Sequence, residues 1–326
     1  MRIAAFLFRR VGDSLLATPA LRALKTRWPD AELSVVAEPH VARVFNHNPS
    51  VTNVVTIECG PSPLQLSAAA RRGGKPDIVV DFLSDPRSAM ATWLTGARTR
   101  VGFSRHGMNW AYTHRVARQD PQHPIYTALH KLELAHELGI ETMDAHTEFY
   151  LTPDDRAFAS AAWQAREWNS AQSVTAFFVF SRREHKRWPL HGFSDVITRM
   201  QLKNISTPLV LATPGDEDAV AELQTKANLP TRHVLKVNNL GQLGAVLERC
   251  RLLIGNDGGP KHVAVALGTP TLTLFGPDSP VYWTPPDSDS HLALTSNGPD
   301  LRSSIKGISP SKVYETAVRM LSALKK

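Results

Sequence analysis

The sequence predicts an α/β protein built from doubly wound parallel sheets. Short apolar segments alternate with segments of helical periodicity along most of its 326 residues, which is typical of strands joined by crossover helices. Several apolar segments have no polar face, as expected for parallel strands covered by helices on both sides. The alternation is interrupted once, between residues 151 and 172. Because the chain is long enough for two ordinary domains, we expect domains at residues 1–160 and 161–326.

Ten apolar segments are predicted to be strands, and they divide equally between the two domains. They span residues 2–8, 32–38, 53–57, 77–82 and 100–103 in the first domain and 173–180, 208–213, 233–237, 251–256 and 271–276 in the second. Ligands of such folds bind at the carboxyl ends of the strands. We therefore expect two similar domains that face each other across a cleft at these ends.

Two helices have clear start signals, one in the segment that connects the two domains and one at the end of the second domain. The first begins at "TPDD" (Thr152 to Asp155) and continues with an amphipathic pattern and no strand. The second, "SPSKVYETAVRMLSALKK", is a capped amphipathic helix at the end of the chain. We expect this final helix, residues 310–326, to pack back on the N-terminal domain.

The composition indicates a soluble globular protein of the cytoplasm. Hydrophobic residues make up 42% and charged residues 21% of the chain, which is ordinary for such proteins. The apolar start of the sequence is followed by two arginines, the wrong order for a signal peptide, and no apolar run reaches 18 residues. Cys59 and Cys250 lie far apart and have no partner at metal-ligand spacing, so we expect reduced thiols, no disulfide and no metal site.

The net charge of +7 predicts an acidic partner. No Asp or Glu occurs between Arg87 and Arg118, whereas arginines recur there, among them Arg98 and Arg105. Nucleic acid, an anionic membrane surface and a phosphorylated substrate are all consistent with this charge, as is a merely solvated basic face. The segment lacks the aromatic and basic interleaving of nucleic-acid-binding modules, so we expect no nucleic-acid partner.

The loop "NDGGPKHVAVALG", which follows the strand at 251–256, carries the clearest functional signal. The first turn of the following helix has unpaired N–H groups that bind phosphate well. Gly258 and Gly259 would let a ligand approach the backbone and can supply a positive φ, and His262 would add a hydrogen bond. The alternative is that Asp257 caps the helix and the glycines only make the turn.

Three further loops follow strands in the same way. Asp13 lies at the start of a helix, where it either caps the helix or acts as a general base. Lys186, among arginines in "SRREHKRWP", would neutralise a pyrophosphate leaving group without a metal. Asp216 and Glu217 either cap a helix or hold ribose hydroxyls. Because the sequence lacks a dinucleotide G-x-G-x-x-G after an early strand, a P-loop and a G-x-S-x-G elbow, these loops favour a nucleotide-sugar transferase.

Four motifs in the same order over nearly the whole chain resemble the bacterial ADP-heptose:lipopolysaccharide heptosyltransferases. They are "GDSLLATPALRALK", "DFLSDPRSAMATWLTGARTRVGF", "KRWP" and "LIGNDGGPKHVAVALGTPTLTLFGPDSP". The resemblance implies a GT-B fold, with two Rossmann-like domains that bind the acceptor and the nucleotide sugar respectively. It also implies inverting transfer of heptose from ADP-L-glycero-D-manno-heptose to the lipopolysaccharide inner core, with no metal and no cofactor.

The resemblance also implies roles for individual residues. Asp13 would deprotonate the acceptor hydroxyl, and Lys186 would stabilise the diphosphate of the donor. The other implied donor contacts are Ser181, Arg182, Glu217 (or Asp216), Asp257, Gly258, Gly259 and His262, and the implied acceptor contacts are Arg87, Arg98 and Arg105. Gly258 departs from the family, which usually has a hydroxyl residue there.

The implied partners are a nucleotide sugar and an anionic glycolipid acceptor. We expect a monomer that contacts the cytoplasmic face of the inner membrane peripherally. Two other readings remain. One is a related glycosyltransferase with a different nucleotide sugar or acceptor, because donor choice depends on few side chains. The other is a non-catalytic scaffold that binds nucleotide or glycan, which the presence of Asp13, Lys186, Asp257 and His262 disfavours.

Overall fold

The computed structural model describes residues 1–169, 171–296 and 304–324, and the chain divides into two compact units, Met1–Tyr150 and Leu151–Lys326. The division falls earlier than the boundary at residue 160 that the sequence suggests, so helix α7 (Pro153–Gln164) belongs to the second unit. Within the described part of the chain, no helix is both long and apolar enough to span a membrane.

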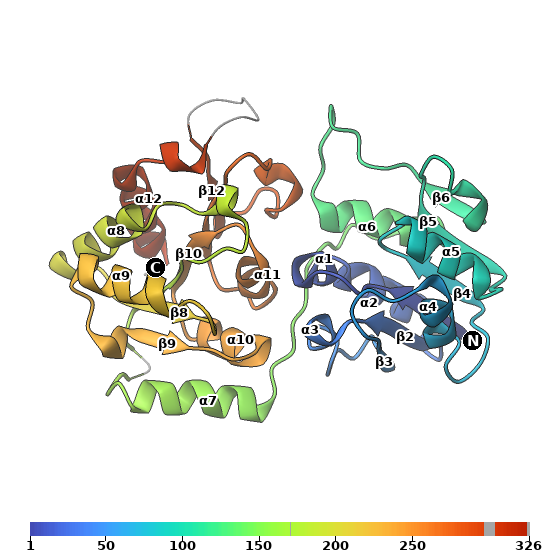
Figure 1. The fold of residues 1–326 in the computed structure, drawn as a ribbon, viewed down its shortest axis with the longest axis horizontal. Coiled ribbons are helices and arrows are strands. Elements are labelled where there is room, and N and C mark those ends of the chain that lie inside the picture. Colours follow the sequence, from blue (N-terminus) through green and yellow to red (C-terminus); the bar gives the residue numbers. More distant parts are fainter. Residues whose placement is uncertain (170, 297–303, 325–326) are drawn as a thin grey trace. The chain divides into compact units, whose positions relative to one another are not determined.

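The first unit contains a six-stranded parallel sheet in the order β3-β2-β1-β4-β5-β6 (Figure 1). Right-handed crossovers place α4 and α5, which pack together, on one face, and α2, which packs on α6, on the other. The strands are β1 (Arg2–Phe6), β2 (Glu32–Ala37), β3 (Asn53–Thr56), β4 (Ile78–Asp81), β5 (Thr99–Phe103) and β6 (His114–Val116). The helices are α1 (Val11–Leu15), α2 (Thr18–Arg27), α3 (Pro39–Ala42), α4 (Pro63–Ala70), α5 (Pro86–Leu94) and α6 (Thr127–His136).

The second unit repeats this arrangement, with a parallel sheet in the order β12-β11-β10-β7-β8-β9. Helices α8, α9 and α12 pack together, and α10 packs on α7 and α11 (Figure 1). The strands are β7 (Val174–Phe178), β8 (Thr207–Ala212), β9 (Val234–Lys236), β10 (Leu252–Asn256), β11 (Thr271–Leu274) and β12 (His291–Leu294). The helices besides α7 are α8 (Leu190–Leu202), α9 (Glu217–Ala227), α10 (Leu240–Glu248), α11 (Gly259–Ala266) and α12 (Pro310–Ala323).

Both strand orders are those of a Rossmann fold, so the predicted fold class is confirmed. The strand order reverses direction between β1 and β4 in the first sheet and between β7 and β10 in the second. Loops that leave the carboxyl ends of these strand pairs diverge and leave a crevice for a ligand. All ten predicted strands are present, and β6 and β12 are additional edge strands that the apolar pattern did not reveal.

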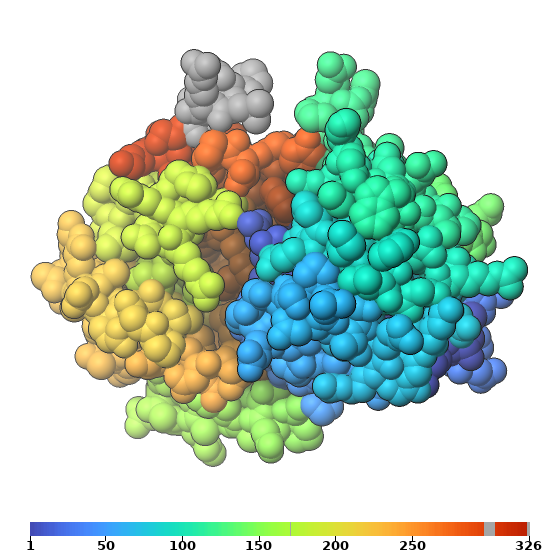
Figure 2. Space-filling model, turned by 45° about the vertical axis from the view of Figure 1, so that its right-hand side comes forward, coloured from blue at the N-terminus to red at the C-terminus, as the bar shows by residue number. Residues whose placement is uncertain are grey.

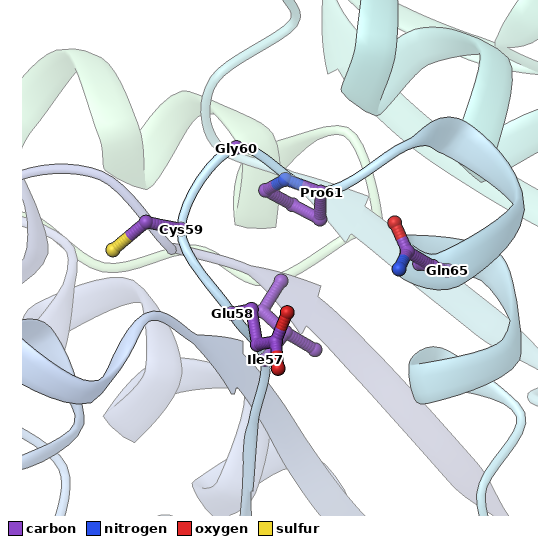
Figure 3. A pocket seen from close by; sticks show the side chains of 6 residues that line it. All are labelled: Ile57, Glu58, Cys59, Gly60, Pro61 and Gln65. Atoms are coloured by element: carbon purple, nitrogen blue, oxygen red, sulfur yellow. The ribbon is translucent and has the colours of Figure 1, made fainter.

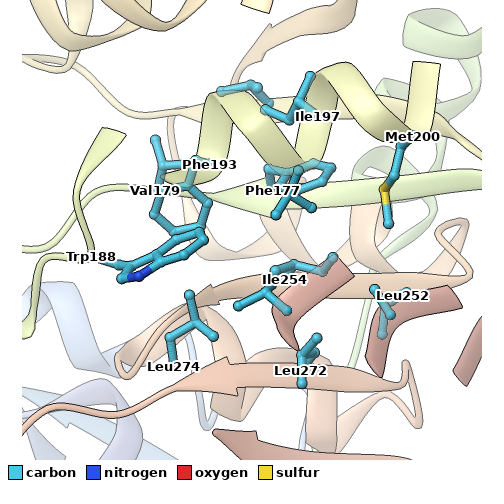
Figure 4. Close-up of a cluster of buried hydrophobic side chains, with 14 of the residues drawn as sticks. Phe177, Val179, Trp188, Phe193, Ile197, Met200, Leu252, Ile254, Leu272 and Leu274 are labelled. Atoms are coloured by element: carbon cyan, nitrogen blue, oxygen red, sulfur yellow. The ribbon is translucent and has the colours of Figure 1, made fainter. Parts of the chain in front are cut away.

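A large apolar core fills the space between the second sheet and the helices α8 and α12 (Figure 4). Phe177, Ile254 and Leu272 from three neighbouring strands are buried in it. Trp188 follows the β7 loop and is also buried. Its indole N–H donates to the Ile308 carbonyl at 3.0 Å. This anchor fixes the end of the loop that carries Lys186.

The first and last helices of the second unit both pack within it. A capping box at Thr152 and Asp155 starts α7, and this helix lies at the surface beside α10 (Figure 2). Gly241 of α10 allows the close approach, because a Cβ there would overlap the Asp155 carboxylate. In α12, Val313 and Ala317 are buried in the core of the second unit. The described part of the final helix therefore packs on the domain to which it belongs in sequence.

Candidate functional site

The reversal point of the second sheet brings together the loops after β7 and β10. Lys186 lies in a short 3₁₀ turn (Glu184–Lys186) of the first loop, and Asp257 directly follows β10. The Lys186 ammonium lies 2.5 Å from a carboxylate oxygen of Asp257 and 2.5 Å from one of Asp278. The side chain of Asp257 is only 6% exposed and that of Lys186 15%. The two loops are thus joined by a largely buried ion pair at the reversal point of the sheet.

This environment keeps Lys186 charged. Burial disfavours its ammonium, but the carboxylates of Asp257 and Asp278 outweigh that cost, and the pKa of Lys186 is raised. An ammonium has three N–H donors, of which the two carboxylates take two. Among the described residues no further acceptor contacts this ammonium, so one donor remains for an anionic ligand.

Lys261 is a second ammonium at the same carboxylate. It lies 3.5 Å from Asp257, donates to the Trp283 carbonyl at 2.6 Å and lies 4.9 Å from the centre of the Phe275 ring. Burial lowers the pKa of Lys261 to about 8, although Asp257 opposes the shift. The N-cap of α11 is Gly258 rather than Asp257. The capping interpretation of Asp257 is therefore wrong, because its carboxylate is directed to the two lysines.

The two glycines of this loop do not adopt a positive φ, which corrects one expectation from the sequence. Gly258 is fully extended (φ −178°), and Gly259 is the first residue of α11. A Cβ on Gly258 would meet no atom closer than Pro260 Cδ at 3.8 Å. His262 is buried in α11 and lies edge-on to the Trp283 ring at 6.2 Å.

The other predicted donor contacts of the β7 loop lie on the same segment as Lys186. Ser181 is half-buried and accepts a hydrogen bond from the Arg183 N–H at 3.3 Å, whereas Arg182 is exposed. The Arg187 guanidinium donates back to the Ser181 carbonyl. This bond and the buried Trp188 hold both ends of the loop.

Asp216 and Glu217 follow β8, the strand next to β7. The Asp216 carboxylate accepts from the N–H and the hydroxyl of Thr213, at 2.8 and 2.6 Å, and makes no capping bond to α9. Glu217 is exposed, and its carboxylate lies 3.0 Å from the Lys236 ammonium. Its own backbone N–H and Lys236 lower the pKa of Glu217. Glu217 is thus an ionised, accessible carboxylate at the carboxyl edge of the sheet.

The first sheet has its own reversal point, where Arg9 and Asp85 form an ion pair at 2.8 Å across the loops after β1 and β4. Asp13 lies within α1, whose N-cap is Arg10, so the capping interpretation of Asp13 is wrong. The buried Lys131 of α6 donates to the Asp13 carbonyl, and its ammonium lies 3.8 Å from the Asp13 carboxylate. Burial lowers the pKa of Lys131, and Asp13 opposes that shift.

A buried network shapes the loop after β4. Asp81 accepts hydrogen bonds from the N–H groups of Leu83 and Ser84 and, at 2.7 Å, from the Tyr112 hydroxyl. Burial raises the pKa of Asp81, which these hydrogen bonds oppose. The Tyr112 ring lies over Gly102, where a Cβ would overlap it. The network fixes the turn that leads into the first residues of α5.

The three predicted acceptor arginines do not lie together. Arg87 in the first turn of α5 and Arg105 after β5 both lie at the carboxyl edge of the sheet. Arg98 precedes β5 and therefore lies at the opposite edge. Arg118, which the sequence analysis did not select, bridges the carboxyl-edge loops by donating to the carbonyls of Ser84 and Ser104, at 2.8 and 3.1 Å.

Sequence reasoning missed four charged residues near the two reversal points: Lys131, Lys261, Asp278 and Arg118. Lys261 and Asp278 lie inside the quoted motif that contains the β10 loop. Lys261 lies four residues after Asp257, a spacing at which side chains on a helix are neighbours. Arg118 ends the segment without acidic residues. Lys131 lies in an ordinary helical pattern, and only the fold brings it to Asp13.

One group of possible metal ligands was not apparent from the sequence. Glu38, His40 and Cys59 offer ligand atoms that all lie within 4.8 Å of one another, beyond the carboxyl ends of β2 and β3. The sequence does not reveal this group because its members are not neighbours in sequence, whereas parallel strands bring separate loops to one edge.

The comparisons with known proteins agree with this architecture. The sequence pattern of glycosyltransferase family 9 (heptosyltransferase) matches residues 70–304. Lipopolysaccharide heptosyltransferase 3 of Escherichia coli K12 is 26% identical over 298 residues, 84% of this chain and 82% of the relative. Lipopolysaccharide heptosyltransferase 2 of the same strain is 23% identical over 297 residues, 85% of this chain and 82% of the relative.

Solved structures of similar proteins have the same fold. A family 9 glycosyltransferase from Veillonella parvula superposes with a TM-score of 0.87 at 22% identity, over 99% of this chain and 97% of that one. Escherichia coli ADP-heptose lps heptosyltransferase II superposes with a TM-score of 0.79 at 21% identity, over 100% of both chains. The E. coli heptosyltransferase WaaC, solved with ADP-2-deoxy-2-fluoro heptose, gives 0.71 at 18% identity, over 98% of this chain and 99% of that one. The resemblance seen in the sequence is confirmed, and this chain of GT-B fold belongs to glycosyltransferase family 9, the heptosyltransferases.

Proposed function

We propose that this glycosyltransferase transfers heptose from ADP-L-glycero-D-manno-heptose to the inner core of lipopolysaccharide, with inversion and without a metal or cofactor. The names of its relatives support the acceptor, and the heptose nucleotide bound to WaaC supports the donor. The proposal includes a monomer that acts at the cytoplasmic face of the inner membrane.

The Lys186 ammonium at the reversal point of the second sheet carries the proposal. Negative charge grows on the leaving diphosphate as the bond to the anomeric carbon breaks, and a fixed cation there lowers the barrier. Lys186 is held by Asp257 and Asp278 and has one N–H donor left for a phosphate oxygen. The N–H groups at the start of α11 would meet the same diphosphate, with Ser181 and Arg182 on the facing loop. Glu217 would hold the ribose hydroxyls.

Asp13 would be the general base of the reaction. Its carboxylate would take the proton of the acceptor hydroxyl while that oxygen attacks the anomeric carbon from the face opposite the diphosphate. The carbon–oxygen bond to the diphosphate then breaks, ADP leaves with the electron pair, and the configuration at the sugar is inverted. Arg87 and Arg105 would bind the phosphates or carboxylates of the acceptor. Arg98 is left out of this site, since it lies at the other edge of the sheet.

Calorimetric titration with ADP, UDP and GDP in the presence of a chelator tests the donor. We expect ADP to bind most tightly, and incubation with ADP-heptose and inner-core acceptor to give a product heavier by one heptose. Preference for UDP or GDP would keep the transferase and discard heptose as the donor sugar. Absence of binding to all three would favour the non-catalytic scaffold.

A further inference from the structure

The cluster of Glu38, His40 and Cys59 lies outside the donor and acceptor contacts assigned above. Glu38 directly follows β2, His40 lies in α3, and Cys59 is in the loop after β3. The cluster therefore combines a carboxylate, an imidazole and a thiol from two loops at one sheet edge. These are the three ligand types that zinc takes in proteins.

The orientation of the His40 ring suits a metal. Its Nε2 lies 3.1 Å from the Arg9 carbonyl oxygen, and since a carbonyl can only accept, Nε2 carries the proton. In the neutral ring Nδ1 then has the free electron pair, and Nδ1 is the atom that faces Glu38, 3.7 Å from its carboxylate oxygen. A ring N–H donated to a backbone carbonyl is the usual support of a histidine ligand.

The separation of His40 and Glu38 suits a shared metal ion better than a direct hydrogen bond, and the Cys59 thiol is close enough to the Glu38 carboxylate to hydrogen-bond with it. At 3.7 Å, Nδ1 and the Glu38 carboxylate are too far apart to share a proton well. Ligand atoms around a tetrahedral zinc lie about 3.3–3.8 Å apart, given bond lengths of ~2.0–2.3 Å. Glu38 is buried, and its second oxygen accepts from the Gly60 N–H at 3.4 Å, so the carboxylate is held in place.

The loop around Cys59 leaves the thiol accessible. Figure 3 shows this loop at a surface pocket lined by Ile57, Pro61 and Gln65, with the sulfur atom turned away from Gln65. Cys59 is exposed, and His40 keeps 45% of its side-chain surface. An ion can therefore enter from solvent, and a water molecule can complete the coordination.

We propose that Glu38, His40 and Cys59 form a site for a thiophilic divalent cation of the zinc class, with one position open to solvent. The site requires no role in glycosyl transfer. Zinc binding would replace the proton of the Cys59 thiol, which passes to solvent, by a sulfur–metal bond.

The two cysteines of the chain give a direct test. Cys59 is exposed and Cys250 is buried, so the reaction of the native protein with Ellman's reagent reports on Cys59. In a non-chelating buffer, equimolar Zn²⁺ should slow this reaction at least about tenfold, and EDTA should restore it. Co²⁺ should produce a sulfur-to-cobalt charge-transfer band and the visible bands of a tetrahedral ion.

Variants separate a built site from binding by a lone thiol. Cys59→Ser should abolish the charge-transfer band, and His40→Ala and Glu38→Gln should each weaken zinc binding about 100-fold or more. The controls Cys250→Ala and His106→Ala, the second of an exposed histidine, should bind zinc normally. The proposal is overturned if zinc does not protect Cys59, or if it protects Cys59 equally in the His40 and Glu38 variants.

Discussion

Lys131 and Asp13 show how a single buried residue can set the geometry of a candidate base. The Lys131 side chain is 5% exposed, donates to the Asp13 carbonyl and stays within 3.8 Å of the carboxylate. It touches no substrate in the proposed reaction, so it is a positioning residue for α1.

We predict that Asp13→Asn lowers the transfer rate at least about 100-fold, because it removes the general base, whereas ADP binding is unchanged.

Lys131→Met should lower kcat about tenfold with little change in KM, since it loosens α1 without removing a substrate contact, and Lys131→Arg should restore part of the loss. Steady-state kinetics and ADP titration measure both effects. Asp30→Asn, at an exposed position, is the control. Full transfer by Asp13→Asn would refute the base assignment.

Gly258 offers a prediction about donor binding. Its extended backbone suits any residue, and a Cβ there would have open space. Gly258→Ser should fold normally and, by supplying a hydroxyl donor to the phosphates, tighten ADP binding by roughly twofold to tenfold. Thermal unfolding and calorimetry measure the two effects.

The neighbouring Gly255 provides the matched control for that substitution. A Cβ at Gly255 would lie 2.6 Å from the Phe178 carbonyl oxygen, so Gly255→Ser should lower the melting temperature. Unchanged or weaker ADP binding by Gly258→Ser would mean that the phosphates do not approach residue 258.

At the scale of elements, the sequence predicts the central strands of each sheet better than the edge strands. Apolar runs such as 251–256 are long, and their lack of a polar face identifies strands buried on both sides. The edge strands β6 and β12 are short or only partly buried, so the apolar pattern is weak there. The periodicity of the sequence identifies a helix or strand, but it does not show which other residues its side chains contact.

The sequence identifies candidate site residues that lie in loops after strands. It does not identify residues that only the packing of distant elements brings to the site. Asp257 and Lys186 both follow strands, and the fold joins them across 71 residues of sequence. Lys131 meets Asp13 across 118 residues, a contact that no local pattern contains. Arg98 and Arg105 are separated because they lie at opposite ends of β5. The density of arginines in the sequence does not show this.

The start of α11 predicts a pH dependence of donor binding. Below its pKa of about 8, Lys261 is protonated, and the two ammonium groups of Lys186 and Lys261 balance the carboxylates of Asp257 and Asp278. Above that pH Lys261 loses its proton, and the group carries one excess negative charge that repels a diphosphate. ADP binding should therefore weaken by roughly threefold to tenfold between pH 7 and pH 9.5.

Variants at Lys261 identify the source of that dependence. Lys261→Met should bind ADP more weakly at pH 7 and show little further change up to pH 9.5, measured by calorimetry. Lys312→Met removes an exposed lysine of α12 and should keep the wild-type profile. An equal decline in wild-type protein and Lys261→Met would assign the titration to another group.

On the scale of the whole molecule, the chain uses one topology twice. In each unit the sheet reverses its order between its first and fourth strands, and in each unit an ion pair joins the two loops there, Arg9 with Asp85 and Lys186 with Asp257. In each unit, charged groups from separate loops therefore meet where the strand order reverses. These ion pairs are neutral, so the net charge of +7 comes from other residues.

That excess charge predicts salt-sensitive binding to anionic membranes. The proposed acceptor is a glycolipid, and exposed arginines such as Arg105 and Arg115 lie in the segment without acidic residues. Each basic residue near an anionic surface contributes about 1 kcal/mol, and salt screens this attraction. The protein should sediment with vesicles that contain phosphatidylglycerol at about 0.05 M salt, release at about 0.5 M salt, and ignore pure phosphatidylcholine vesicles.

Two double variants of equal charge decide whether the segment or only the net charge is responsible. Arg105→Gln with Arg115→Gln should lose most of the binding, whereas Arg71→Gln with Arg72→Gln, two exposed arginines outside the segment, should lose little. Equal losses would show that net charge alone attracts the protein and would remove the segment from the membrane contact. No sedimentation with anionic vesicles at low salt would refute peripheral binding through charge, and the acceptor would then have to be recognised without help from the membrane surface.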